Sequence, residues 1–153
     1  MLRQINLRCA MKRIFLLSLL FFASCAWTKV DPEKAKAVAE NYLTDQKNER
    51  YENINDYFTS SFNESESQEQ KIEQLKRIKE VLGAIESYEL KDTKVTQRGL
   101  DDPSTVQLIY KVKYARGTAE QTFVIMNDEG KHKITFQNIV TGAPAVLENV
   151  LEN

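Results

Sequence analysis

Few residues in this 153-residue chain have side chains suited to catalysis or metal binding. There are two cysteines, Cys9 and Cys25, and one histidine, His132. A nucleophile–histidine–carboxylate triad would have only His132 to use, and its neighbours Lys131 and Lys133 indicate a surface position after a turn. Zinc sites need clusters of cysteine and histidine, and no glycine-rich phosphate loop or G-x-S-x-G elbow is present. We therefore expect no catalytic, cofactor-binding or metal site.

The segment that leads to Cys25 has the pattern of an export signal. Lys12 and Arg13 precede an apolar run over residues 14–22, and small residues follow. Spanning the hydrocarbon core takes about 20 apolar residues, so this run is too short to cross a membrane comfortably. Because a complete signal begins at Met11, residues 1–10 are either an upstream misassigned start or an extension.

Residues 22–25, Phe-Ala-Ser-Cys, resemble the lipobox of bacterial lipoproteins. The resemblance implies that residues 1–24 are cleaved and that the Cys25 sulfur carries a diacylglycerol. Phe22 departs from the pattern, because leucine is usual there. A cleaved signal without lipid fits less well, since Phe22 stands where such a cut needs a small residue. An uncleaved anchor with an idle thiol is the remaining alternative. Ala26, in place of aspartate, implies delivery to an outer membrane with the domain facing the periplasm, if the source has two membranes.

Removal of residues 1–24 leaves a length typical of one domain, residues 31–153, after a tether of residues 25–30. The tether can extend by at most roughly 20 Å, so the domain must lie close to the bilayer. The mature chain has 17 Lys and Arg against 22 Asp and Glu, a net charge of −5. This excess disfavours nucleic acid as a partner and leaves no basic patch for anionic lipid. With Cys25 acylated, the domain has no thiol, so its stability must come from its core.

Apolar spacing predicts three N-terminal helices. Asp31 and Pro32 begin the first, which runs to about Gln46. A short aromatic helix is expected within residues 51–62, and a third helix runs from a capping box at Ser67 and Gln70 to Gly83. The apolar positions are Ala35, Val38, Ala39, Tyr42 and Leu43, then Tyr51, Ile54, Tyr57, Phe58 and Phe62, then Ile72, Leu75, Ile78, Val81 and Leu82.

From Glu86 the apolar period changes to two, which predicts four strands at about 86–97, 104–115, 118–127 and 131–140. Short turns favour an antiparallel meander. Beyond Pro144 an amphipathic tail is expected to close the sheet edge or cover the core, with partner binding as the alternative. The expected inner face comprises Val106, Leu108, Tyr110, Val112, Tyr114, Phe123, Ile125, Ile134 and Phe136, and the outer face includes Ile109, Val124 and Met126.

Helices followed by a curled four-stranded antiparallel sheet give an α+β fold that resembles the NTF2-like superfamily and its small bacterial lipoproteins. The residues that carry the resemblance are the helix start Asp31-Pro32-Glu33-Lys34-Ala35, Tyr57-Phe58 with Phe62, Leu82-Gly83, and the strand pattern through Phe136. It implies a cone that encloses a cavity, in which catalytic members place an aspartate with a tyrosine or histidine. The inward candidates here are Tyr42, Tyr57, Tyr110, Tyr114 and His132, and no aspartate shares their inward position.

Those tyrosines are better explained as core aromatic rings whose hydroxyls reach the rim. We therefore interpret the chain as a non-enzymatic, lipid-anchored envelope protein that binds a protein partner, a second copy of itself or a small apolar ligand. The apolar outer positions Ile109, Val124 and Met126 are one candidate contact surface. The alternatives are an NTF2-like enzyme that uses acid–base chemistry in its cavity, and a spacer without a specific ligand.

Intact-mass analysis of the native product tests the export interpretation. We expect a chain that begins at Cys25 and carries the mass of a diacylglycerol on its sulfur. An unmodified Cys25 thiol, or retention of residues 1–24, would contradict lipid anchoring.

Overall fold

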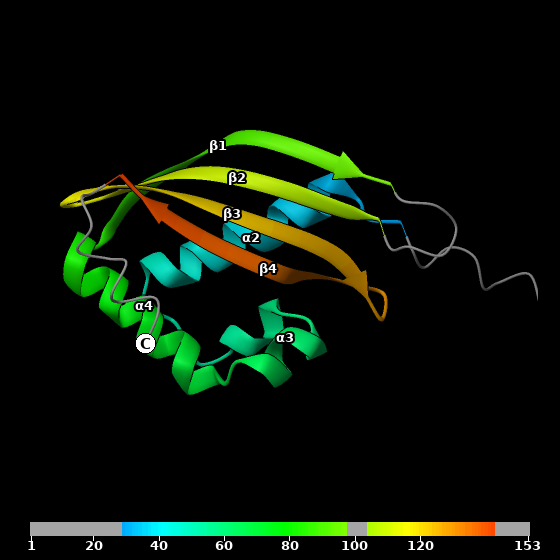
Figure 1. The fold of residues 1–153 in the computed structure, drawn as a ribbon, viewed down its shortest axis with the longest axis horizontal. Helices are drawn as coiled ribbons and strands as arrows, with labels where there is room; N and C mark the ends of the chain where they lie inside the picture. The colour runs from blue at the N-terminus through cyan, green and yellow to red at the C-terminus, as the bar shows by residue number, and fades with distance from the viewer. Residues whose placement is uncertain (1–28, 98–103, 143–153) are drawn as a thin grey trace, which may run out of the picture.

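A computed structural model describes residues 29–97 and 104–142, and shows helices packed against a four-stranded antiparallel sheet (Figure 1). The expectations for the leader, Cys25 and the tail beyond Pro144 lie outside these residues. The α+β order of helices followed by a meander is confirmed, and the sheet is open rather than closed into a barrel. The elements are the helices α2 (Pro32–Lys47), α3 (Ser60–Ser65) and α4 (Gln68–Leu82), the 3-10 turn η2 (Ile54–Tyr57), and the strands β1 (Ile85–Thr96), β2 (Thr105–Tyr114), β3 (Gly117–Asp128) and β4 (Lys131–Thr141), in the order β1-β2-β3-β4.

The chain enters the domain through a fixed contact at the start of α2. The Asp31 carboxylate caps the helix by accepting from two backbone N–H groups of the first turn, and Pro32 occupies the first helical position. Just before the helix, the Val30 N–H donates to Ser104 Oγ over 3.1 Å, and the Asp31 N–H donates to His132 Nε2 over 3.0 Å. The first residues of the domain are thus tied to the starts of β2 and β4.

The third predicted helix, α4, has the predicted ends. The Ser67 side chain and the Gln70 side chain each accept from the other residue's backbone N–H, which is the capping box. At the other end, Gly83 has a φ of 85°, a conformation that favours glycine. A Cβ there would lie 2.9 Å from the Ala115 Cβ, so glycine is also required by the close approach of the chain before β3.

The single aromatic helix expected within residues 51–62 is wrong. The segment divides into η2 and α3, and Phe58 between them is extended. Thr59 explains the division, because its hydroxyl accepts from the Phe62 N–H and so begins a new helix. Phe58 instead forms a parallel bridge with Ile134, and the Thr59 N–H donates to the Ile134 carbonyl over 3.0 Å.

The expectation that Phe136 lies on the inner face is also wrong, and a β-bulge in β4 is the reason. Ile125 pairs with Ile134, but the preceding residue of β3, Val124, pairs with Phe136. Thr135 is therefore an extra residue that reverses the facing of everything after it. Ile134 is fully buried, whereas 49% of Phe136 is exposed on the outer face.

The same bulge brings Gln137 and Ile139 to the inner face, opposite Phe123 and Gln121. The two partners on β3 are fully buried, which confirms that this is the core side of the sheet. On the other side, Val140 joins Phe136 on the outer face. The apolar residues of the outer face, most of them half-buried, are Ile109, Val124, Met126, Phe136 and Val140.

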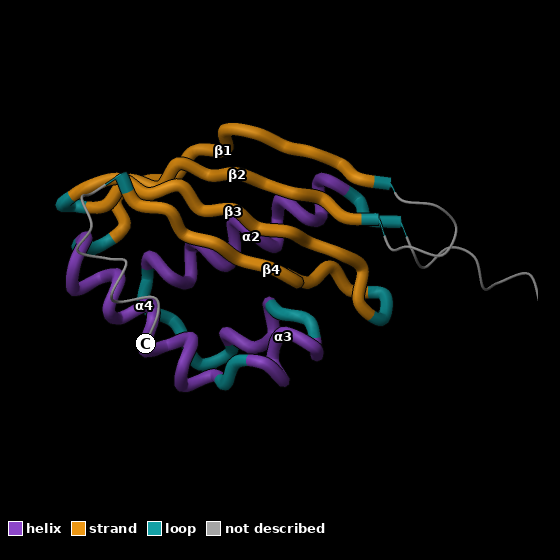
Figure 2. Tube along the Cα trace, viewed as in Figure 1, coloured by secondary structure: helices purple, strands orange, loops and turns teal. Residues whose placement is uncertain are grey.

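Figure 2 shows the strands as one layer, with α2 across it and with α3 and α4 alongside β4. The core lies between α2 and the inner face of the sheet. Its largest fully buried side chains are Tyr110, Phe123, Leu43, Leu108, Ile125 and Ile134. The predicted inner face of β2 is confirmed throughout, because Val106, Leu108, Tyr110, Val112 and Tyr114 are all buried.

The His132 contact predicts sensitivity to acid. Its Nε2 can accept from Asp31 only while the imidazole is neutral, and burial, with Lys34 nearby, lowers the His132 pKa although Asp31 opposes this. The unfolded chain therefore takes up this proton more readily than the folded chain does, so stability falls as the pH drops below about 6.5. In urea unfolding at pH 7.5 and 5.5, we expect His132→Gln to show a smaller loss between the two pH values than the wild type. An equal loss in both proteins would contradict this role.

Candidate functional site

The five polar-tipped residues predicted from the sequence do not form one site, although the rings of Tyr42 and Tyr57 meet edge to face with their centroids 5.5 Å apart. Tyr110 is fully buried in the core, and burial raises the pKa of its hydroxyl. Tyr114 is buried near the other end of β2, where its hydroxyl accepts from Gln121 Nε2 over 2.7 Å and burial raises its pKa to about 12. His132 lies at the entry of the chain into the domain. These three groups serve the fold and form no common site.

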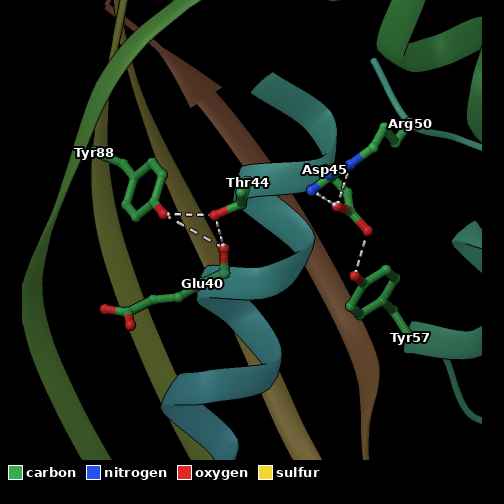
Figure 3. A network of polar contacts seen from close by, with 6 residues as sticks. All are labelled: Glu40, Thr44, Asp45, Arg50, Tyr57 and Tyr88. Atoms are coloured by element: carbon green, nitrogen blue, oxygen red, sulfur yellow. Dashed lines mark hydrogen bonds and ion pairs between the residues drawn. The ribbon is translucent and has the colours of Figure 1, made fainter. Parts of the chain in front are cut away.

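Tyr57 lies beside an aspartate, which the sequence interpretation did not foresee (Figure 3). Its hydroxyl donates to Asp45 Oδ2 over 2.5 Å, and Arg50 donates to Oδ1 of the same carboxylate over 2.6 Å. Burial and this hydrogen bond raise the pKa of Tyr57 to about 12, so the hydroxyl stays protonated at neutral pH. With its carboxylate shared between Arg50 and Tyr57, Asp45 fixes η2 to α2 rather than serving as a base.

On the opposite side of α2, Tyr88 of β1 makes a second polar contact (Figure 3). The Tyr88 hydroxyl lies 2.9 Å from Thr44 Oγ1, and the Thr44 hydroxyl donates to the Glu40 carbonyl over 2.7 Å. These bonds connect the middle of α2 to the edge of the sheet. The network of Figure 3 therefore positions α2 between β1 and η2.

A cavity of about 180 Å³ lies between α4 and β4. The cavity lies here because α4 runs alongside β4. Phe58 and Phe62, which precede α4 in the chain, close one end of it. This volume far exceeds that needed by one water molecule and is enough for a side chain or a small ring. The apolar walls are formed by Phe58, Phe62, Leu75, Ile78 and Ile139.

One side of the cavity is polar. The Tyr42 hydroxyl donates to Gln137 Oε1 over 3.0 Å, and burial raises the Tyr42 pKa. This bond fixes the Gln137 amide, whose nitrogen remains a donor. Glu66 also lines the cavity, and its Oε1 is buried with no hydrogen-bond partner among the residues that the structure describes. The arrangement thus offers one buried acceptor with negative charge and one fixed amide.

Lys71 also lines this cavity and is only 4% exposed. Its ammonium donates to Asn55 Oδ1 (3.1 Å), Asn63 Oδ1 (3.0 Å) and the Glu66 carbonyl (2.5 Å). It also lies 5.3 and 5.4 Å from the ring centroids of the two phenylalanines of the apolar wall, a cation–π arrangement. Burial lowers the Lys71 pKa, while Glu66 and Glu69 oppose this. Since all three N–H donors are used, Lys71 holds the wall in place rather than binding an anion.

Sequence reasoning missed the residues that matter here. Glu66 lies between the second and third predicted helices, and no local pattern marks its buried oxygen. Lys71 did carry a signal, because it lies four residues before Leu75 and seven before Ile78 on the apolar stripe of α4. Gln137 was missed because the bulge reverses its facing, which strict alternation does not anticipate.

Comparisons with protein-family models, with curated proteins and with solved structures found no match. Within residues 29–97 and 104–142, no three His, Cys, Asp or Glu side chains gather in a way that could hold a metal ion. None of the helices in the described part of the chain is both long and apolar enough to span a membrane. What the cavity could bind is therefore inferred from the residues that line it.

Replacing Lys71 with methionine tests its role in the wall. The change keeps the apolar stem but leaves the acceptors of Asn55, Asn63 and Glu66 without their donor. We expect the free energy of unfolding to fall by about 2–3 kcal/mol, because buried acceptors lose their partner. In the same urea experiment the exposed control Lys76→Met should change stability by less than about 0.5 kcal/mol. Equal effects of the two changes would contradict a structural role for Lys71.

Proposed function

We propose that this chain is a lipid-anchored bacterial envelope protein whose folded domain is a non-enzymatic binding module. The sequence before the domain supports the anchor, through the export pattern and the lipobox resemblance at Cys25. The fold supports a close approach to the bilayer, because Val30 and Asp31 are already fixed to Ser104 and His132. Little chain then remains between the lipid and the domain, so the end with the β3–β4 turn faces the membrane.

The cavity lies away from that end. Gln137 and Ile139 are five and seven residues beyond His132 along β4, which corresponds to roughly 16–23 Å at the rise of a strand. In this orientation the cavity opens on the flank of the domain, in the aqueous phase. The position favours a soluble partner over a lipid of the anchoring bilayer.

The observation that carries the binding function is the buried, unpartnered oxygen of Glu66. A buried acceptor without a donor costs about 1–3 kcal/mol. Five buried side-chain atoms in the described residues have no partner, and the Glu66 oxygen is the one that belongs to the lining of this cavity. Here the atom borders a cavity with apolar walls and a fixed amide, which is the usual composition of a ligand site. A ligand that donates to Glu66 would recover that cost.

The alternative is acid–base catalysis in the same cavity, since Glu66 and Tyr42 both line it. A general acid works best when its pKa lies near the operating pH. Burial raises the Tyr42 pKa, and its proton is engaged by Gln137. Tyr42 is thus poorly suited to transfer a proton, and this geometry favours binding over catalysis.

Crosslinking in intact cells tests the proposal. A photo-reactive residue at Gln74, an exposed position of α4 that lines the cavity, should capture a specific partner in the membrane fraction. The matched control places the same residue at Lys94, an exposed position on β1. Capture from Gln74 and not from Lys94 supports a binding module at the envelope. Equal capture from both positions, or recovery of the protein in the soluble fraction, would contradict it.

A further inference from the structure

The backbone of β4 presents hydrogen-bonding groups on the side that faces away from β3. The Gly142 N–H donates to the Thr118 carbonyl over 3.5 Å, which marks these two residues as a hydrogen-bonded pair of the antiparallel ladder. By alternation along the strand, Asn138 also directs its N–H and C=O toward β3, whereas Gln137 and Ile139 direct theirs outward. Because β4 is the last strand of the sheet, these groups form an edge over residues 137–141 that no described residue pairs with.

The first half of the β4 edge already accepts an added segment. Phe58 bridges Ile134 in parallel, and the Thr59 N–H bonds to the Ile134 carbonyl. After Thr59 the chain turns into α3 and leaves the strand. In the part of the chain that the structure describes, no segment continues this pairing at Gln137 or Ile139.

The two edges of the sheet differ in how they are protected. Unpaired edges usually carry bulges, lysines or other charges that prevent strand addition. The β1 edge has two register shifts and the exposed Lys91 and Lys94, whereas β4 has one shift, at Thr135, before the regular pairing of residues 136–141. Residues 135–141 of β4 read Thr-Phe-Gln-Asn-Ile-Val-Thr, without charge, proline or glycine. This part of the β4 edge therefore lacks the charges and prolines that prevent strand addition.

The chemistry of the cavity beside this edge suits a basic side chain. Its apolar walls suit a chain of methylene groups, and the buried Glu66 oxygen suits a charged donor at the tip. Lys71 does not offer a binding site for an acidic group, because its three donors are occupied. The net charge of −5 on the chain after residue 24 also favours a basic partner.

We propose that the binding partner is an extended peptide segment that adds as a strand to the free edge of β4 and places an arginine or lysine side chain in the cavity, against Glu66. This inference rests on the proposed binding function and specifies its partner. Main-chain bonds to Gln137 and Ile139 supply affinity, and the cavity supplies the preference for a basic residue.

Nuclear magnetic resonance titration of the full chain in detergent tests the inference. The probes are capped pentapeptides of alternating threonine and valine with arginine, glutamine or leucine at the centre. We expect the arginine peptide to shift the amide signals of Gln137 and Ile139 more than that of Asn138, and to bind about tenfold more tightly than the leucine peptide. No shift at this edge, or equal affinity for the three peptides, would overturn the inference.

Two variants test the cavity and the strand edge separately. Glu66→Gln keeps the shape of the side chain and should abolish the preference for arginine over glutamine. Ile139→Pro removes one outward N–H and should weaken all three peptides alike, and if it fails to fold, Glu66→Gln still decides. An unchanged arginine preference in Glu66→Gln would overturn the role of the cavity.

Two other occupants of the edge are distinguished by the same titration. Binding that appears only in a variant that ends at Gly142 would assign the edge to residues 143–153 of this chain and overturn the inference. Edge shifts that follow protein concentration without peptide would assign it to a second copy, with the same consequence. If the peptides fail while crosslinking from Gln74 still captures a partner, the binding function stands and only the peptide is wrong.

Discussion

The buried ammonium of Lys71 holds together the segments that form one wall of the cavity. Taking an ammonium out of water costs several kcal/mol, and the cost is recovered only when hydrogen bonds satisfy it. Lys71 meets this condition with oxygens from η2, from α3 and from Glu66, the C-cap residue of α3. The aromatic rings beneath it add a cation–π attraction. This one side chain therefore fixes three segments that bury little apolar surface of their own, and with them the position of Glu66.

The bulge at Thr135 makes the opposite wall. By reversing the facing of β4, it turns Phe136 to the outer face and brings Gln137 and Ile139 into the cavity. Gln137 can then accept from Tyr42, which connects the wall to α2. Without the bulge, strict alternation would place Phe136 where Gln137 now lies and fill the cavity with an aromatic ring. Bulges are often found beside binding sites, where they direct side chains in this way.

Much of the fold could be predicted from the sequence because its signals are local. The cap at Asp31, the capping box at Ser67 and the glycine at residue 83 act within a single turn of helix, and the alternation of β2 reflects one buried face. The site could not be predicted, because it depends on contacts between distant residues. Tyr42 and Gln137 are 95 residues apart, and the chain breaks at Thr59 because its N–H bonds to the Ile134 carbonyl of β4 as well as because its hydroxyl caps α3.

Strand addition by a partner requires the second half of the β4 edge to be unpaired in the isolated protein, beside the cavity that Lys71 and the bulge create. Amide hydrogen exchange along β4, measured residue by residue in the full chain, reports whether these groups are paired. The structure predicts an alternating pattern, with slow exchange at Asn138 and Val140 and fast exchange at Gln137, Ile139 and Thr141. Uniformly slow exchange over residues 137–141 would show that another segment already covers the edge and would rule out addition of a partner strand there.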